Sequence, residues 1–166
     1  MTKDGQFVPT IADIRKARDL LRFKVPTELA DIILDMAEYH HVITLTTNRP
    51  RNIFNSVHHA DVPILSLYLS RPEYSEFLDC LLRVSLVIKG HDQGWSGYPE
   101  DKGTLRNSWT WYSIGTDDPR THEKRLATNL HAVGDTQTHV FEWDRGSDIV
   151  QWLKEGKKVE VWAHAR

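Results

Sequence analysis

The sequence predicts a mainly β (α+β) fold: an antiparallel β-sandwich or a jelly-roll-like barrel with a two-helix N-terminal segment. From Arg83 onward, apolar and polar residues alternate with a period of two in short stretches between turn residues, which is typical of antiparallel strands. Residues 1–41 instead show helical spacing. The chain has 166 residues, of which 40% are apolar and 27% charged, as in an ordinary globular protein.

Two amphipathic helices are expected in the N-terminal segment, residues 1–41. Thr10 is placed to cap the first helix through Asp13, and the second begins near Pro26, a residue that suits a first helical turn. Their apolar positions are Ile11, Ile14, Ala17 and Leu21, then Leu29, Ile32, Ile33 and Met36. Two such stripes cannot bury each other completely, so we expect the segment to dock on a β-sandwich domain formed by residues 42–166.

The domain at 42–166 is expected to consist mostly of short strands. Strands are predicted at 42–47, 64–69, 83–89, 108–114, 126–131, 139–143 and 159–164. Residues 147–154 are predicted to form a short helix with Ile149, Val150 and Leu153 inward, while 72–80 fits a short helix or an irregular connection. Trp109 and Trp111 share one face of their strand, and we expect that face to meet the core.

The last predicted strand, 159–166, runs to the final residue. This pattern is typical of a domain truncated at its C-terminal strand, or of one whose missing strand comes from a partner. Either way an unpaired edge would remain, and such edges recruit other chains. We therefore expect self-association through this edge strand.

Charge and cysteine content argue against several classes of protein. The net charge of −2 and the lack of Lys/Arg runs argue against binding to nucleic acid or to an anionic membrane. Cys80 is the only cysteine, so an intramolecular disulfide is impossible. The N-terminus has no apolar signal region, and no apolar stretch approaches the ~20 residues of a membrane helix. A cytoplasmic location is predicted.

The loop "HDQGWSGYPED", residues 91–101, is the predicted site. Loops held by a rigid sheet are where binding residues concentrate. An indole ring can stack on a small molecule, a glycan or a peptide while polar neighbours fix its orientation. The candidate ligand-binding residues are His91, Asp92, Gln93, Trp95 and Tyr98. In the alternative interpretation, Trp95 folds back as a corner plug, and Asp92 and Ser96 bond loop amides.

The predicted function is that of a non-catalytic ligand-binding or protein-interaction module. One alternative is a helix-led adaptor that recruits a partner through residues 25–39. Another is a hydrolase that uses Asp92, Glu100 and Asp101 as acid and base. No motif positions a nucleophile, and no catalytic residue is assigned. The apolar sequence around Cys80 predicts an inert thiol.

Two histidine pairs contain residue types that bind metal ions, but they lack the spacing of known zinc motifs. His40-His41 and the run His58-His59-Ala60-Asp61 match no zinc pattern. Adjacent helical side chains diverge, so one ion rarely takes both. No metal site and no cofactor are predicted.

Three segments resemble a signature of mostly uncharacterised fungal proteins. They are "HDQGWSGYPEDKGT…SWTWY" (91–112), "RLATNLHAVGDTQTHVFEWD" (125–144) and "LKEGKKVEVWAHAR" (153–166). The resemblance covers about residues 64–166 and implies a β-sandwich-like fold, which in that family continues with another aromatic-containing strand. It implies no activity. "VPTELADIILDMAEY" (25–39) is similar to the opening helix of an F-box, although the characteristic Trp and further helices are missing.

Overall fold

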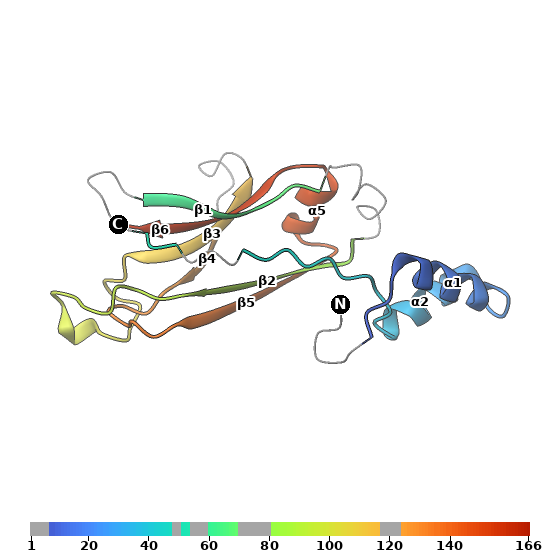
Figure 1. Ribbon diagram of the computed structural model, residues 1–166, viewed down its shortest axis with the longest axis horizontal. Helices are drawn as coiled ribbons and strands as arrows, with labels where there is room; N and C mark the ends of the chain where they lie inside the picture. The colour runs from blue at the N-terminus through green and yellow to red at the C-terminus, as the bar shows by residue number, and fades with distance from the viewer. Residues whose placement is uncertain (1–6, 48–50, 54–59, 70–80, 117–123) are drawn as a thin grey trace. The chain divides into compact units, whose positions relative to one another are not determined.

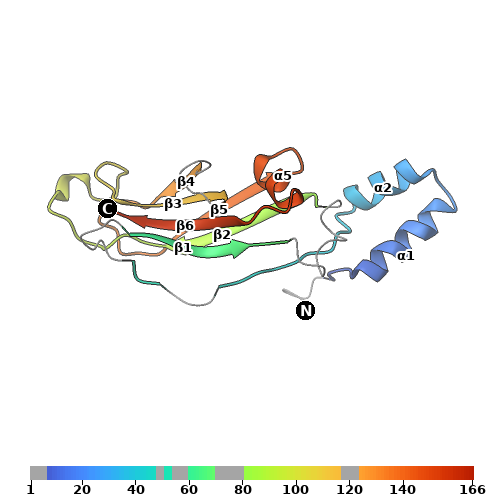
Figure 2. The ribbon, with the colours of Figure 1, turned by 90° about the horizontal axis from the view of Figure 1, so that it is seen from above.

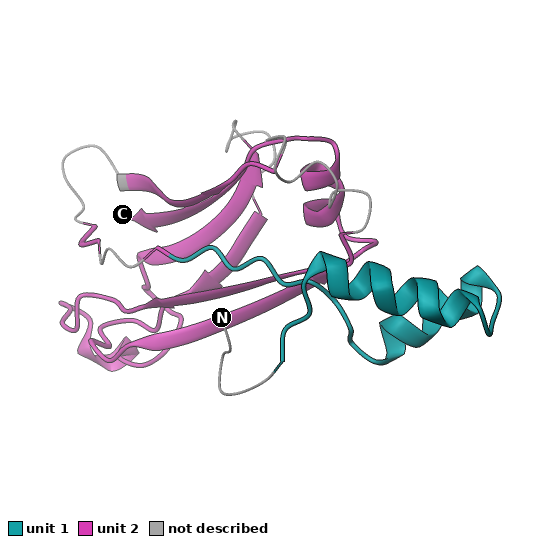
Figure 3. Cartoon of the chain, turned by 45° about the vertical axis from the view of Figure 1, so that its right-hand side comes forward, with its two compact units in different colours: residues 1–46 teal, residues 47–166 magenta. Residues whose placement is uncertain are grey.

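The chain divides into two compact units, residues 1–46 and 47–166 (Figure 3). A computed structural model describes residues 7–47, 51–53, 60–69, 81–116 and 124–166. The predicted segments at 72–80 and around His58, His59 and Cys80 lie outside these residues. None of the helices in the described ranges is long and apolar enough to cross a membrane.

The first unit is a pair of helices, α1 (Ile11–Arg22) and α2 (Thr27–Met36). The predicted cap is confirmed: the Thr10 hydroxyl accepts a hydrogen bond from the Asp13 amide (3.2 Å), and the Asp13 carboxylate accepts one from the Thr10 amide (2.9 Å). Arg18 on α1 binds both carboxylate oxygens of Asp31 on α2, at 2.6 and 2.7 Å. This hydrogen bonding lowers the pKa of Asp31 below its usual value and ties the two helices together.

The helix pair leaves much of its apolar surface uncovered. Ala30 is the one helical residue of this unit that is fully buried, whereas Met36 is 82% exposed. Leu29, Ile32 and Ile33 are exposed as well. Docking of this surface on the β domain therefore stays a prediction.

Residues 42–47 do not form the predicted strand. They have no regular secondary structure, and Val42, Ile43 and Leu45 are exposed. A β-branched sequence favours an extended backbone but needs a neighbouring strand to become part of a sheet. No described strand pairs with this segment, so its β-branched residues do not become part of a sheet.

The second unit contains two antiparallel sheets, which gives an α+β fold (Figures 1 and 2). The first sheet has the order β1-β6-β3-β4, and the second pairs β2 with β5. The strands are β1 (Ala60–Leu67), β2 (Arg83–Gly90), β3 (Thr110–Thr116), β4 (Lys124–Thr128), β5 (Gln137–Asp144) and β6 (Val159–Ala165). A 3-10 turn, η1 (Pro99–Asp101), and a helix, α5 (Asp148–Lys154), complete the described elements. Neither sheet closes into a barrel.

One hydrophobic core joins the two sheets and α5. Its buried members are Leu86 and Ile88 of β2, Tyr112 and Ile114 of β3, Ile149 and Leu153 of α5, and Val159, Val161 and Ala163 of β6. The predicted helix at 147–154 is confirmed: Ser147 caps it, and Ile149, Val150 and Leu153 are buried. Burial of side chains of this size stabilises the fold by about 1.5–3 kcal/mol each.

The predicted orientation of β3 is wrong. Tyr112 and Ile114 face the core, while Trp109, just before the strand, is 51% exposed and Trp111 is only partly buried. Alternation shows which residues share a face, but it does not show which face is inside. Because Trp109 and Trp111 share a face, the sequence predicts that this face is buried, whereas the opposite face meets the core.

The predicted edge strand at 159–166 is also wrong, because β6 lies inside its sheet. β1 pairs with it on one side and β3 on the other: Ala163 is opposite both Val62 and Tyr112. The described edges of this sheet are β1 and β4. Self-association stays a prediction, but β6 offers no free edge for it.

Candidate functional site

Two loops at one end of the second unit are joined by their backbones. The β2–β3 loop spans residues 91–109, and the β4–β5 loop spans 129–136. The Gly103 amide donates to the His131 carbonyl (2.9 Å), and the His131 amide donates to the Thr104 carbonyl (2.8 Å). The buried ring nitrogens of His131 have no hydrogen-bond partner among the described residues, so its backbone, and not its ring, connects the loops.

Asp92 is a buried anchor between these loops and not an open ligand contact. Its side chain is almost fully buried, and its carboxylate accepts from the Ala132 amide (2.8 Å) and the Thr110 hydroxyl (3.3 Å). Ala132 has a φ of +54°, a left-handed conformation that costs energy for a residue with a Cβ. The carboxylate therefore helps to hold a strained turn in place.

Asp101 is a second buried anchor, and its partners all lie within the β2–β3 loop itself. It is buried, and its carboxylate accepts from the Asn107 side-chain amide at 2.6 Å and lies 3.4 Å from Arg106 Nε. Its carbonyl accepts from the Thr104 hydroxyl (2.7 Å). Two of the acids proposed for a hydrolase are thus engaged by protein groups, and the third, Glu100, is exposed.

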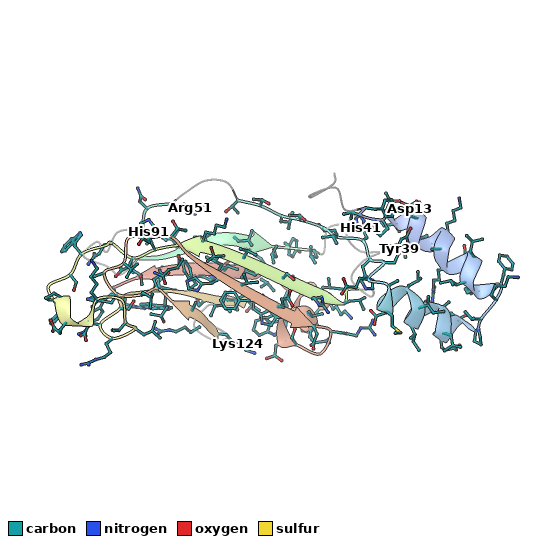
Figure 4. The ribbon with its side chains drawn as sticks, turned by 90° about the horizontal axis from the view of Figure 1, so that it is seen from below. Asp13, Tyr39, His41, Arg51, His91 and Lys124 are labelled. Atoms are coloured by element: carbon teal, nitrogen blue, oxygen red, sulfur yellow. The ribbon has the colours of Figure 1, made fainter. Side chains whose placement is uncertain are left out.

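The remaining predicted site residues lie at the surface of the loop. Trp95 is 71% exposed and Tyr98 is 52% exposed, so Trp95 is not a corner plug. The Gln93 side chain donates to the Trp95 carbonyl (2.9 Å), and the Ser96 hydroxyl accepts from the Tyr98 amide (2.9 Å). His91 begins the loop where β2 ends (Figure 4), with Nδ1 2.6 Å from the Asp92 carbonyl. The structure thus keeps two exposed aromatic rings on a braced loop.

A second group of polar and aromatic residues covers the outer face of the four-stranded sheet. The Trp111 ring stacks on the His164 ring, with centroids 4.8 Å apart and planes 8° apart. Two guanidinium groups also lie over the Trp111 ring: Arg125 from β4 at 4.5 Å and Arg166, just after β6, at 5.2 Å. We call Trp111, Arg125 and Arg166 the arginine–tryptophan cluster.

A chain of three polar groups crosses the same face. Asp61 Oδ1 lies 2.7 Å from His164 Nδ1, and His164 Nε2 lies 2.6 Å from the Ser113 hydroxyl. Acid, imidazole and hydroxyl in this order are the parts of a Ser-His-Asp triad. A nucleophilic serine must reach its substrate, however, and Ser113 is 0% exposed. The arrangement is a hydrogen-bonded brace across β1, β6 and β3.

Sequence analysis missed both groups on this face. Asp61 and His164 are 103 positions apart, and they meet only because β1 pairs with β6. One signal was present: Trp111 and Ser113, like His164 and Arg166, alternate on one side of their strands. On β3, the side that carries Trp111 is the one that the sequence predicts to face the core.

No group of three or more His, Cys, Asp or Glu in the described ranges could hold a metal ion. His40 Nε2 lies 3.5 Å from Asp35 of its own helical unit, and His41 Nδ1 lies 3.2 Å from the Pro9 carbonyl. His58 and His59 lie outside the described residues.

Comparison with known proteins adds no identification. The chain matches no protein-family model, no curated protein and no solved structure.

Proposed function

We propose that the chain is an intracellular, non-catalytic recognition module built on a β-sandwich, and that it binds its ligand through the β2–β3 loop. The observation that carries this proposal is the 71% exposure of Trp95 on a loop braced by two buried carboxylates. Exposed aromatic rings on a rigid support bind with little loss of conformational entropy.

The ligand class that fits this loop is a glycan or a peptide. Trp95 and Tyr98 offer flat apolar surface for stacking, and the exposed side chains of His91 and Gln93 are polar neighbours. Stacking on a ring together with a few oriented hydrogen bonds is how such ligands are held at open sites.

Glycan and peptide arrays probed with the purified protein test this proposal. Hits should be lost in Trp95→Ala and weakened in Tyr98→Ala. Tyr68→Ala is the matched control, because Tyr68 is a similarly exposed tyrosine (49%) that follows β1. If Trp95→Ala still binds the hits, or if Tyr68→Ala reduces binding equally, the β2–β3 loop is not the binding site.

A second candidate function is that of an adaptor that binds a partner helix through α2. The observation in its favour is the row of exposed apolar residues on α2, with Met36 as its most exposed member. An amphipathic helix with an uncovered apolar face is a common means of engaging a partner. Loss of partner binding in Ile32→Asp, with the Trp95→Ala variant unaffected, would support this function over the first.

A further inference from the structure

We propose that the arginine–tryptophan cluster on the outer face of the four-stranded sheet binds a phosphate monoester group. The three residues of this cluster lie outside the β2–β3 loop, and the inference does not rest on the proposed function.

The cluster brings two cations to one place and holds them there. β4 and β6 are the two neighbours of β3 in the sheet, and Arg125 and Arg166 each reach over the β3 residue Trp111. Stacking on an indole ring restrains a guanidinium group and leaves its N–H donors at the edge available. Both guanidinium carbons lie within 5.2 Å of the same ring centroid, and we infer that an oxyanion beside this ring is their common ligand.

The charges at the cluster are not balanced. Arg125 forms no ion pair with any residue that the structure describes, and Arg166 Nη2 lies 3.8 Å from Asp61 Oδ1. That same oxygen is 2.7 Å from His164 Nδ1. Lys124, which is labelled in Figure 4, is the residue before Arg125 and pairs instead with Asp148. Arg166 therefore lies near a carboxylate that already has another partner, and Arg125 has no carboxylate partner among the described residues.

A phosphate monoester fits this arrangement better than a carboxylate does. It carries roughly −1.5 to −2 charges at neutral pH and offers three terminal oxygens, enough for two arginine forks at once. Trp109 lies two residues from Trp111 on the same side of the chain and is half exposed. Its ring supplies apolar surface for the organic group that bears the phosphate.

Titration of the full chain with phenyl phosphate tests the proposal. We expect saturable binding with a Kd of about 1 mM or tighter by calorimetry, and selective shifts of the Arg125 and Arg166 Nε–H signals by NMR. Arg125→Gln and Arg166→Gln should each weaken binding about tenfold, which corresponds to the loss of one charge-assisted contact. Arg145→Gln, a change of an exposed arginine in the turn after β5, should leave binding unchanged, as should Trp95→Ala.

Two further titrations distinguish phosphate from carboxylate, and a phosphorylated protein from a small phosphate ester. Benzoate should bind at least tenfold more weakly, and equal affinity for benzoate would overturn the assignment to phosphate. A phosphotyrosine peptide that binds more tightly than phenyl phosphate indicates a phosphorylated protein as the source, and equal affinity indicates a small ester. Absence of saturable binding, or equal signal shifts at Arg145, would overturn the site. The NMR readout on the unaltered protein keeps the test valid if a variant fails to fold.

Discussion

Gly90 and Tyr112 are in close contact between the two sheets. A Cβ on Gly90, at the end of β2, would overlap the Tyr112 hydroxyl of β3. Burial raises the pKa of this hydroxyl above its usual value, and a hydrogen bond with Asn129 opposes the rise. The missing side chain at position 90 therefore makes room for a buried polar group.

Gly90→Ala should destabilise the protein by about 1–3 kcal/mol, because overpacking forces the sheets to shift. Adding Tyr112→Phe removes the overlapping oxygen and should recover most of this loss, leaving a close contact with the ring. Urea unfolding of the two single variants and the double variant measures the effect. If the losses simply add, the hydroxyl is not the obstacle.

Alkaline pH should destabilise the fold through Tyr112. Because the folded pKa is raised, the folded state favours the neutral phenol. This contribution is fully present below the unfolded pKa of 10.0 and is lost as the pH rises through the folded pKa. Unfolding free energies from about pH 8 to about pH 11 should fall less steeply in Tyr112→Phe than in the unaltered protein. Parallel curves would contradict this prediction.

Asp92→Ala should cost about 1–3 kcal/mol, because it leaves the buried Ala132 amide without an acceptor. Asp92→Asn keeps one carbonyl oxygen and should cost less. Hydrogen exchange gives a local readout, since protection at Ala132 should fall in both variants and most in Asp92→Ala. Unchanged protection would mean that the carboxylate does not hold the turn.

At the level of single elements, sequence reasoning succeeds where the determinants are local. The Thr10–Asp13 capping box and the inward face of α5 each depend on residues within a few positions of one another. It fails at β3 and β6, where the outcome depends on partners far along the chain. Strand alternation could not show that Tyr112 and Ile114, and not the tryptophans, meet the second sheet.

In the candidate site, too, the features that depend on neighbouring residues could be predicted, and those that depend on distant residues could not. Exposure of Trp95 follows from its glycine-flanked loop, and so could be predicted. Burial of Asp92 depends on Ala132 in a separate loop, and no local pattern reveals it. The outer-face groups require the β1-β6-β3-β4 order, which no pattern in the sequence specifies.

The start of α1 should weaken in acid. Hydrogen bonds from Thr10 lower the pKa of Asp13, so its stabilising effect is present above the usual value of 3.8 and is lost as the pH falls through the lowered folded value. Chemical shifts of residues 10–14 should then move toward coil. In Asp13→Asn, the chemical shifts of these residues should be coil-like and should no longer depend on pH in this range. If that variant still shows the acid transition, Asp13 is not the group that causes it.

At the scale of the whole molecule, Met36 tests how the two units cooperate. The helix pair itself leaves Met36 exposed, so Met36→Asp should disturb little within that unit. If the units dock, as the sequence predicts, the Tm should fall because a buried methionine contributes about 1.5–3 kcal/mol. Ala12→Asp, an exposed change on α1, is the control. If both variants have the same Tm as the unaltered protein, the result would argue against docking and favour the adaptor function.

The interior position of β6 has a consequence for how the protein is made. β1 and β3 both take β6 as a partner, and the β1–β6 contact between Asp61 and His164 spans 103 positions. At a synthesis rate of 5–20 residues per second, β1 waits roughly 5–20 s for that partner. The β3–β4 hairpin can form earlier, since Trp111 pairs with Thr128. A nascent chain stalled before residue 159 should therefore present β1 and one side of β3 as open edges to chaperones, and release of the next few residues should close both at once.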